Sequence, residues 1–564
     1  MSFDYDVCVI GSGAGGGPIA YELSQAGFKV VVLEKGPWFK ENDFSKDELA
    51  CCRRKVYTPE LSNEQHVLQQ PNDDGSWDET PTSESGWSFW NGNCVGGSSN
   101  FMSGFFHRLK PVDFRQLSEF GAIEGANRVD WPISYDELEP YYDKVEKIVG
   151  VSGQHIPHKN SEPRSSADYP YPPTVEHPVS SWIDNACETL GYHALKVPRA
   201  ILSRPDQNRR SCEYSGYCGS FGCSSGAKGS SRAALLDQAF ASGNCEIRTH
   251  CKVDKIETDR QGKITSVRYF DKQGQTQHVD ARIYVVACQA IESSRLLLYS
   301  TGPKFANGLA NNNGQVGKNL IFSAGGVGQG DIEFSGLSED RLTELRTVGP
   351  FVNRALDDWY VFEDATDIHG REKGGIVEFL FEHPNPAVKA NSVKWDGDGD
   401  LLWGQPLKRQ LETWFTTDRT LTFEVFNDWL PTDNCHISLD NGISDRWGTP
   451  VAKVKLGYHP HDLKVGNHLV SKGEEVLKQL GAVRINSGVS GAPPQNLQAG
   501  GCRFGNNGDT SVLDADCRAH EVENLFVTDG SFMPTGGSVP FTWTIYANSF
   551  RVADKIKQQL GQPG

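Results

Sequence analysis

A glycine-rich turn between two periodic segments constrains this chain more than any other feature of its sequence. The apolar run Val7–Ile10 is typical of a buried strand, and residues 18–26 carry apolar side chains at helical spacing. Between them stands GSGAGG, residues 11–16. A strand, a tight glycine turn and a helix in this order favour a βαβ unit whose helix N-terminus faces a phosphate.

Each glycine of this turn has a distinct physical task. Gly11 permits the tight turn, Gly13 lets the backbone approach a pyrophosphate, and Gly16 lets the helix pack close to the strand. A second apolar strand, residues 29–33, ends at Glu34. A carboxylate there, about 20 residues beyond the glycines, accepts hydrogen bonds from an adenosine ribose. These residues therefore predict a dinucleotide site, and the charge of Glu34 would repel the extra phosphate of NADP.

Length and charge set broad limits on the protein. A chain of 564 residues exceeds one ordinary core of roughly 100 to 200 residues, so we expect at least two structural units. The mean hydropathy of -0.48 indicates a soluble protein, and no window approaches the roughly 18 to 20 apolar residues of a membrane span. The formal charge of -17 disfavours nucleic acid and anionic lipid. We predict no nucleic-acid partner and no direct membrane insertion.

Segments farther along the chain resemble the glucose-methanol-choline (GMC) oxidoreductase family. Residues 93–100, NCVGGSSN, look like the family's flavin-proximal segment, in which small residues let backbone and hydroxyls approach the isoalloxazine. Residues 285–293, VVACQAIES, and 316–320, VGKNL, resemble two segments of the middle region, and 522–531, VENLFVTDGS, resembles the second FAD segment. The resemblance implies FAD as the cofactor. Further cofactor-binding residues are then Gly97, Ser98, Asn100 and Asp529.

Within the family, residues 129–142 are similar to the flavoprotein subunits of gluconate, fructose and glucose dehydrogenases, while residues 31–36 also resemble the long-chain alcohol oxidases. In those dehydrogenases a small partner with an export signal carries the folded flavoprotein across the membrane, and a cytochrome accepts the electrons. The resemblance implies both partners. The first residues contain no export signal, so a cytoplasmic location and periplasmic export with a partner both stay open.

Three cysteines stand in a stretch rich in Gly and Ser: Cys212, Cys218 and Cys223. In the resembling dehydrogenases a similarly placed trio carries a [3Fe-4S] cluster that relays electrons from flavin to a cytochrome, and backbone in such a stretch leaves N–H groups free for sulfide. The spacing here, five and then four intervening residues, departs slightly from that pattern. The alternatives are structural free thiols, a disulfide, or a zinc site with His250 or Cys251 as fourth ligand.

The usual catalytic positions of the family carry apolar residues in this chain. In the family, a base near flavin N5, commonly a histidine, takes the hydroxyl proton while the carbinol hydride moves to N5. That histidine stands three residues before a run that appears here at 500–505, which gives Leu497. The partner position, His or Asn, corresponds to Pro540. Neither accepts a proton, so either another group reaches the flavin or the chemistry is not ordinary alcohol oxidation.

The sequence offers several substitutes for the missing histidine. Gln498 is the catalytic candidate, with Gln495 and Asn496 close by, because an amide orients a hydroxyl although it is a very poor base. His520 occupies a place where many relatives have histidine, and we interpret it as structural. The middle region adds candidates that the sequence does not place and that are more typical of surface or packing residues: His369, His383 and His459.

The resemblance implies an α/β fold, α+β overall, with a Rossmann-like FAD-binding domain and a substrate domain that contains a β-sheet. We expect a discontinuous FAD-binding domain comprising residues 1–150, 200–320 and 485–564. Residues 151–199 and 321–484 then form the substrate-binding domain.

Residues 420–426 alternate polar and apolar side chains, as expected of a sheet that roofs a pocket. The sequence predicts an FAD-dependent dehydrogenase that oxidises a hydroxyl group of a sugar, glycoside or sugar acid. Its electrons would leave through the cysteine cluster. Two alternatives stay open: a GMC-type oxidase or lyase with other active-site residues, and a catalytically silent flavin-bearing subunit that serves electron transfer.

Overall fold

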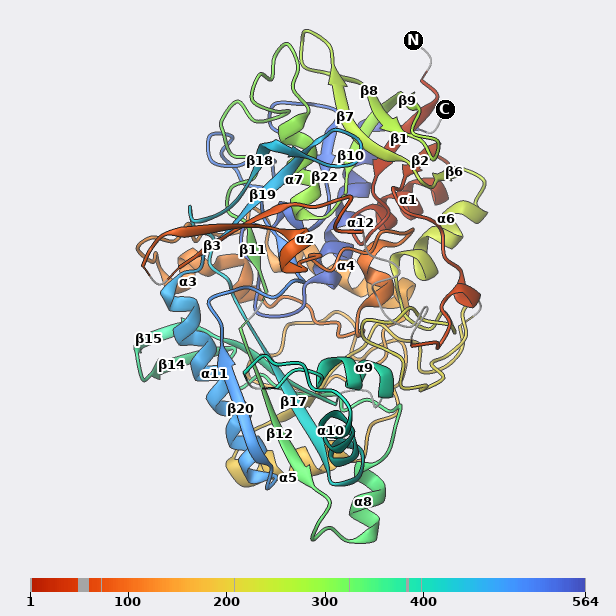
Figure 1. The fold of residues 1–564 in the computed structure, drawn as a ribbon. Helices are drawn as coiled ribbons and strands as arrows, with labels where there is room; N and C mark the ends of the chain where they lie inside the picture. Colours follow the sequence, from red (N-terminus) through yellow and green to blue (C-terminus); the bar gives the residue numbers. More distant parts are fainter. Residues whose placement is uncertain are drawn as a thin grey trace.

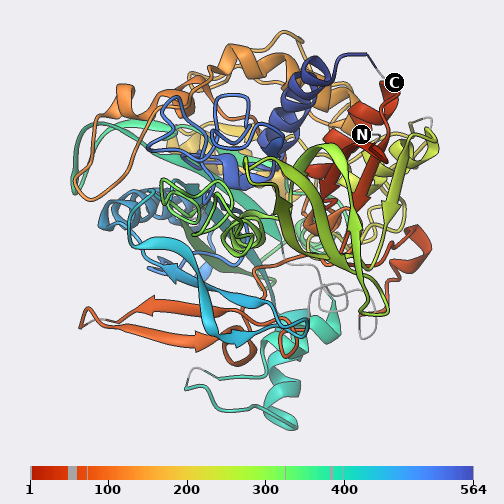
Figure 2. The same ribbon diagram turned by 90° about the horizontal axis from the view of Figure 1, so that it is seen from above.

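Two large sheets organise the protein, one parallel and one antiparallel (Figure 1). The computed structural model describes residues 3–48, 60–72, 74–206, 208–323, 325–381, 385–396 and 398–562. In Figure 1 the parallel sheet lies in the upper half and the antiparallel sheet in the lower half. The two ends of the described chain lie close together beside the parallel sheet (Figures 1 and 2).

The parallel sheet has the strand order β22-β10-β1-β2-β6. Its strands are β1 (Tyr5–Ile10), β2 (Val30–Leu33), β6 (Cys245–Arg248), β10 (Ala281–Val286) and β22 (Leu525–Val527). The short apolar runs of these strands are buried. Helix α1 (Gly16–Gln25) packs against β1 and β2, and β8 (Ile264–Phe270), from a separate three-stranded sheet, contacts β10. Helix α1 also packs against α12 (Thr542–Leu560), which in turn packs against α4 (Tyr135–Val145). The predicted Rossmann-like FAD sheet is confirmed.

The antiparallel sheet has the order β20-β12-β17-β16-β13-β5. Its strands are β5 (Ala194–Lys196), β12 (Gly326–Glu333), β13 (Arg354–Leu356), β16 (Gly375–Phe381), β17 (Asp418–Asn427) and β20 (Val483–Val489). Two helices pack with this sheet, α5 (Val179–Leu190) and α11 (Pro460–Gln479).

Strand β17 confirms the alternation predicted for residues 420–426. Leu421, Phe423 and Val425 point into the apolar core that β17 shares with α11 and α5. Glu424 and Phe426 instead line a cavity between the two large sheets. The period of two along a strand therefore separates a packing face from a face that is free for chemistry.

A third sheet joins segments that lie far apart in the sequence. Strands β3 (Val67–Pro71) and β4 (Trp77–Pro81) extend a pair formed by β18 (Cys435–Ser444) and β19 (Pro450–Leu456), as Figures 1 and 2 both show. The predicted division placed β3 and β4 in the FAD-binding domain and β18 and β19 in the substrate domain. This sheet crosses that division, and β20 also begins two residues before the predicted boundary at 485. The domain boundaries stay a prediction.

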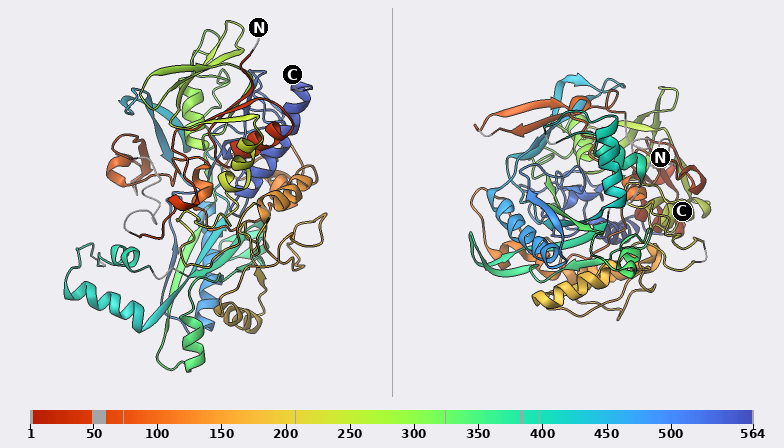
Figure 3. Two further views of the ribbon diagram at one scale, coloured as in Figure 1. Left: turned by 90° about the vertical axis from the view of Figure 1, so that its right-hand side faces the viewer. Right: turned by 60° about the horizontal axis from the view of Figure 1, so that its bottom comes forward.

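The remaining elements are short. The strands are β7 (Lys252–Thr258), β8 (Ile264–Phe270), β9 (Thr276–Val279), β11 (Ile321–Phe322), β14 (Val361–Ala365), β15 (Ile368–Lys373) and β21 (Gln498–Ala499). The helices are α2 (Thr82–Ser85), α3 (Gln116–Phe120), α6 (Asp237–Ala241), α7 (Ala290–Tyr299), α8 (Glu339–Leu345), α9 (Pro386–Ser392) and α10 (Gln405–Thr416). Helices α9 and α10 project from the body (Figure 3). Among the described helices, none combines the length and the apolar character that a bilayer crossing requires.

Candidate active site

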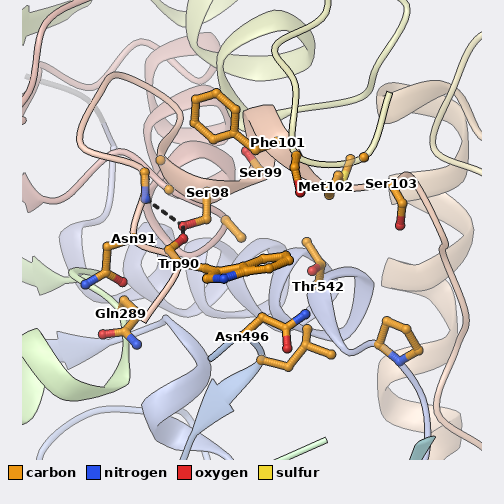
Figure 4. Close-up of a pocket in the computed structure, with 18 of the residues that line it drawn as sticks. Trp90, Asn91, Ser98, Ser99, Phe101, Met102, Ser103, Gln289, Asn496 and Thr542 are labelled. Atoms are coloured by element: carbon orange, nitrogen blue, oxygen red, sulfur yellow. Dashed lines mark hydrogen bonds between the residues drawn. The ribbon is translucent and has the colours of Figure 1, made fainter. Parts of the chain in front are cut away.

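A cavity of about 560 Å³ runs from the first glycine turn to the antiparallel sheet. This volume lies within the roughly 300 to 1,000 Å³ of cofactor and small-molecule sites. Its walls come from both ends of the chain and from the middle, and Figure 4 shows Trp90, Asn496 and Thr542 on them. The cavity is therefore where a dinucleotide on the glycine turn and a substrate under the sheet meet.

In the first glycine turn, Gly11 and Gly16 lie so close to neighbouring backbone that a side chain would not fit. Gly11 has a φ of +94°, and a Cβ on it would lie 2.3 Å from the carbonyl oxygen of Ala287. A Cβ on Gly16 would lie 2.0 Å from the carbonyl oxygen of Gly11, so α1 packs directly on the turn. A Cβ on Gly13 would meet nothing within 4 Å. Gly13 lines the cavity, so the open space there suits a pyrophosphate.

Glu34 lies on the cavity wall at the end of β2. One carboxylate oxygen accepts a hydrogen bond from the backbone N–H of Gly36 at 2.8 Å. The other accepts from the backbone N–H of Ser12 at 3.2 Å and from the Ser12 hydroxyl. Burial raises the pKa of Glu34 despite these donors. The carboxyl group is held rigidly at the position where the sequence predicts a ribose contact.

Asp529 reaches the same cavity from the other end of the chain. Its carboxylate accepts from the backbone N–H of Ser531 at 2.8 Å and from the Ser293 hydroxyl. Burial raises the pKa of Asp529 as well. The structure thus brings Glu34 and Asp529 to one cavity, as two cofactor carboxylates require, and their contacts with the cofactor stay a prediction.

The flavin-proximal segment forms a short 3-10 helix, Gly97–Phe101. Gly97 has a φ of +55°, and a Cβ on it would lie 3.2 Å from the Cα of Gly13, so the two glycine turns touch. The Ser98 hydroxyl accepts from the backbone N–H of Gly92 and donates to the Trp90 carbonyl, each at 2.9 Å, as the dashed lines in Figure 4 show. Both Gly97 and Ser98 line the cavity.

Asn100 was also predicted to bind the cofactor, but it is not among the residues that line the cavity. Its side-chain amide donates to the carbonyl oxygens of Val95 at 2.9 Å and Gly97 at 3.1 Å. Asn100 therefore supports the backbone of the loop that lines the cavity, and its contact with the cofactor stays a prediction.

The positions of the missing histidines lie on the cavity wall, as the resemblance implies. Leu497 and Pro540 both line it, and Leu497 has a φ of +56°, which is unusual for a branched side chain. Asn496 and Thr542 lie beside them in sequence and line the cavity too. These side chains offer no proton acceptor of suitable basicity.

Gln498, the predicted catalytic residue, uses its amide to join three segments of protein. Its Nε2 donates to the carbonyl oxygens of Phe89 at 3.0 Å and Gln495 at 2.6 Å. Its Oε1 accepts from the Gln289 amide at 2.8 Å. Both amide hydrogens are thereby engaged, which indicates a structural role, although its part in catalysis stays a prediction.

The candidate histidines do not reach the cavity wall where the structure describes them. His369 is exposed on β15. His459 begins α11, where its Nδ1 accepts from the backbone N–H of His461 at 3.1 Å. The ring of His520 contacts the Ser511 hydroxyl at 3.0 Å, in agreement with a structural role. His383 lies outside the described residues.

One histidine that sequence reasoning missed, His177, does line the cavity. Its Nδ1 accepts from the backbone N–H of Val179 at 3.1 Å, so the proton is on Nε2, which donates to the Thr347 carbonyl at 3.0 Å. Burial lowers the pKa of His177 to about 4. Both nitrogens are engaged, so this ring is not free to take a substrate proton.

Sequence reasoning also missed Glu424, on the cavity-facing side of β17. It forms no hydrogen bond or ion pair with any residue that the structure describes. Burial, with the nearby charge of Glu378, raises the pKa of Glu424 to about 7. The signal was present in the sequence as a carboxylate on the polar face of an alternating strand.

The three candidate cysteine ligands gather at one place. Cys212, Cys218 and Cys223 are free thiols, and all three pack against one small apolar cluster that includes Phe351. Cys218 lines the cavity. Burial opposes ionisation of Cys223, but the Lys228 ammonium together with hydrogen bonds from Ser225 and the backbone lowers the pKa of that thiol. Burial raises the pKa of Cys212 to about 12. The site thus combines three thiols with a buried cation, and what they bind stays a prediction.

The alternatives for the cysteines fare differently. Within the described residues the three sulfurs do not all lie within 4.8 Å of one another, as the ligands of a single zinc ion would. The backbones of the two proposed fourth ligands make other contacts. The backbone N–H of His250 donates to the Gly36 carbonyl at 3.2 Å, and the backbone N–H of Cys251 donates to the Glu34 carbonyl at 2.8 Å. These contacts lie at the nucleotide end of the cavity.

Solved structures of known proteins share this fold over nearly the whole chain. An Aspergillus oryzae formate oxidase variant superposes with a TM-score of 0.62 at 15% identity, covering 99% of each chain. An FAD-dependent oxidoreductase from Chaetomium thermophilum gives a TM-score of 0.61 at 16% identity, again covering 99% of both chains. At such low identity the likeness shows the fold alone.

Sequence comparisons reach closer relatives. The chain is 31% identical to 2-methyl-1,2-propanediol dehydrogenase of Mycolicibacterium austroafricanum, over 98% of this chain and 95% of that protein. It is 30% identical to paromamine 6'-oxidase of Streptomyces fradiae, over 99% and 92%. It is 24% identical to the gluconate 2-dehydrogenase flavoprotein of Pantoea cypripedii, over 99% and 94%.

Family models described as GMC oxidoreductase match residues 75–323 and 431–549. Together with the relatives above, these matches cover the nucleotide turn, the cavity walls and the antiparallel sheet. The chain therefore belongs to the GMC oxidoreductase family and is an FAD-dependent oxidoreductase that acts on CH–OH donors.

Proposed function

We propose that this enzyme oxidises a hydroxyl group of a sugar, glycoside or sugar acid, and that a sugar acid fits its cavity best. The observation that carries the proposal is a pair of arginines on the cavity wall, Arg199 and Arg419. Both are nearly buried, with 3% and 8% of their surface exposed. Neither forms an ion pair with a described carboxylate. Buried cations that lack a counter-ion favour an anionic ligand.

The contacts of these arginines hold them in place without neutralising them. Arg199 donates to the side-chain oxygen of Asn353 and to the Ser103 carbonyl. Its guanidinium also lies 4.3 Å from the ring centre of Phe351. The Arg419 guanidinium lies 4.7 Å from the ring centre of Phe381 and donates from Nη1 to the Leu345 carbonyl at 3.4 Å. Among the residues that the structure describes, its Nε has no hydrogen-bond partner. A substrate carboxylate would supply the missing acceptor.

The residues of the nucleotide turn and the two carboxylates, Glu34 and Asp529, would hold FAD along the first part of the cavity. Bound FAD supplies the two-electron acceptor for the oxidation. Leu497 and Pro540 exclude water beside the reacting centre, and the polar groups under the antiparallel sheet orient the substrate. The relatives named for a diol, an amino sugar and gluconate support hydroxylated substrates in general.

A panel of substrates tests this proposal. Under anaerobic conditions an aldonic acid is expected to bleach the flavin absorbance faster, at equal concentration, than the corresponding neutral sugar or an amino sugar. Bleaching by neutral compounds alone would contradict the assignment of an acid. A flavin that no hydroxylated compound bleaches would favour a catalytically silent subunit.

We also propose that the three cysteines hold a [3Fe-4S] cluster that passes electrons to an acceptor protein such as a cytochrome. The common location of the thiols and the buried Lys228 support it. Purified protein is expected to contain about three irons per chain and to give an EPR signal when oxidised. Cys218→Ser should abolish the signal and leave FAD bound. Iron-free protein with full flavin content would overturn the cluster.

The partners implied by the cluster are a cytochrome acceptor and a small export or assembly subunit, which would take the protein to the periplasm. Their support is the similarity to the gluconate and fructose dehydrogenase subunits. Co-expression with the neighbouring genes and co-purification would test both. The 30% identity to paromamine 6'-oxidase favours a second candidate, an oxidase. Stoichiometric hydrogen peroxide in air would identify that activity.

A further inference from the structure

The family's usual catalytic positions carry Leu497 and Pro540, and a carboxylate, Glu424, lines the same cavity. We propose that Glu424 on β17 is the catalytic base, which accepts the hydroxyl proton of the substrate. This inference rests on the proposed function, because it assumes that a hydroxyl group is oxidised in this cavity.

The first argument is placement. Glu424 lines the same cavity as Leu497 and Pro540, the positions where the family carries its catalytic pair. It reaches the cavity from the antiparallel sheet, whereas Glu34 and Asp529 follow the ends of β2 and β22 in the parallel sheet. A substrate that enters under the sheet therefore meets Glu424 and not the carboxylates that suit the nucleotide.

The second argument is the absence of a partner. The Glu424 carboxylate makes no hydrogen bond or ion pair within the described part of the chain. Glu424 is only partly buried, and a carboxylate that faces a cavity without such partners is available to a ligand group. The substrate hydroxyl is a suitable donor, and a base must lie within hydrogen-bond reach of the proton it removes.

The third argument is the surrounding charge. Glu378 on β16 pairs directly with Glu424 across the two strands. The Glu378 side chain is fully buried and contacts His107 through one oxygen, while its other oxygen has no partner in the described part of the chain. The opposite neighbour of Glu424, on β12, is the apolar Val327. Arg199 and Arg419 also lie on the cavity wall, but neither forms an ion pair with Glu424.

These surroundings tune the basicity of Glu424. Removal from water and repulsion by Glu378 raise its pKa from the ordinary 4.5 to about 7. A general base works best when its pKa lies near the working pH. Above pH 7 the carboxylate is ionised and ready, and as the pH falls through 7 it becomes protonated and loses this capacity.

Other described cavity residues with the right chemistry are engaged elsewhere. Burial lowers the pKa of Lys252 to about 8, and this side chain pairs with Asp445 and donates to the Thr449 hydroxyl. His177 has both ring nitrogens engaged. Glu292 contacts His66 and Arg295, which hold its pKa well below the ordinary range. Glu34 and Asp529 accept hydrogen bonds from backbone and hydroxyl donors.

The proposed step balances as follows. The substrate O–H bond breaks, and its proton joins the Glu424 carboxylate. The electrons of that bond form the carbonyl double bond, and FAD, which the nucleotide turn, Glu34 and Asp529 would hold, would supply the acceptor for the carbinol hydride. The protonated carboxyl then returns its proton to solvent before the next turnover.

Glu424→Gln tests the proposal because the amide keeps the size of the side chain and removes the base. Flavin content, measured from absorbance, and thermal stability are expected to match the wild type. Anaerobic flavin reduction by substrate is expected to slow about 100-fold or more, the size of general-base effects. In the wild type this rate should rise with pH around a midpoint near 7, and the variant should lose that dependence. Glu424→Asp should recover part of the rate.

Two further variants make the result specific. Glu378→Gln removes the neighbouring charge, so the midpoint of the wild-type pH profile should move to lower pH. Glu333→Gln, an exposed carboxylate on β12 of the same sheet, is the matched control and should change neither rate nor profile. Infrared spectra between pH 6 and 8 should show a titrating carboxyl band in the wild type that Glu424→Gln lacks.

The outcomes separate the two proposals. If the wild type is bleached by substrate and Glu424→Gln is bleached equally fast, Glu424 is not the base and the proposed function stands. If no hydroxylated compound bleaches the wild type, the proposed function fails and the role of Glu424 fails with it. A wild type without the infrared band would also overturn the base assignment.

Discussion

Gly15 and Asp529 lie in contact although they come from opposite ends of the chain. A Cβ on Gly15 would lie 2.6 Å from the backbone nitrogen of Asp529. The Thr528 hydroxyl also donates to the Gly15 carbonyl at 2.9 Å. The backbone just before α1 thus packs directly on the backbone just after β22. This contact places the N-terminus of α1 and the carboxylate of Asp529 on one cavity wall.

This contact predicts opposite behaviour for two neighbouring glycines. Gly15→Ala should lower thermal stability in the absence of FAD, because the new methyl group collides with backbone that cannot move aside. Gly13→Ala should leave that stability within about 1 kcal/mol, the cost of an ordinary helix-end or loop exchange, but lower FAD affinity at least about tenfold. Differential scanning fluorimetry of apoprotein and flavin titration measure the two effects. Equal loss of stability in both variants would contradict this assignment.

Gln498 gives a second prediction, which separates structure from catalysis. Gln498→Ala leaves three hydrogen-bond partners unsatisfied, so the free energy of unfolding should fall by about 1 to 3 kcal/mol. The rate of flavin reduction per bound flavin should fall less than about tenfold, because an amide is a very poor proton acceptor. Urea unfolding and stopped-flow reduction provide the two numbers. A large loss of rate with unchanged stability would restore the catalytic role predicted from the sequence.

The parts of the site that the sequence predicted are those in which the residues lie close together along the chain. Gly11, Gly13, Gly16 and Glu34 follow one another within a single βαβ unit, so their spacing alone indicates their tasks. Asn100 shows the limit of a motif. It belongs to the flavin-proximal segment, but only the fold reveals that its amide faces the loop backbone and not the cavity.

The rest depended on pairing between distant segments. Burial, with the charge of Glu378, raises the pKa of Glu424, and Glu378 becomes its neighbour only when β16 and β17 pair in register. Strands β3 and β19 lie side by side in one sheet although one is near the start of the chain and the other near the end. No local pattern specifies such a register, so the sequence did not indicate this sheet, and the domain division stays a prediction.

The buried neutral His177 predicts a pH dependence of stability. Its pKa is about 4 in the folded protein against 6.5 ordinarily. The unfolded chain therefore binds the extra proton first as the pH falls, so this stability is fully present above pH 6.5 and is lost between pH 6.5 and 4. The loss is of the order of 3 kcal/mol. Urea unfolding of the wild type and of His177→Gln, at pH 7.5 and pH 5, measures it. The same pH dependence in both proteins would exclude His177 as its source.

Replacement of Arg419 is expected to raise thermal stability and to weaken the preference for an acidic substrate. Because its Nε lacks a partner and its charge is nearly buried, Arg419→Met should raise the melting temperature slightly, as replacement of a buried charge by an apolar side chain often does. If a substrate carboxylate pairs with this guanidinium, kcat/KM for an aldonic acid should fall about 10- to 100-fold, the value of a hydrogen bond to a charged group. The value for the neutral sugar should change much less.

The matched control for that variant is Arg484→Met on β20, since this arginine is exposed and its side chain pairs with Asp331, Glu333 and Asp418 at the surface. It should leave both kcat/KM values unchanged. Equal losses on acid and neutral substrates in Arg419→Met, together with a lower melting temperature, would show that Arg419 only supports the wall. A selective loss on the acid with a stable protein would mean that the unpaired charge is retained for substrate binding, because it contributes nothing to folding.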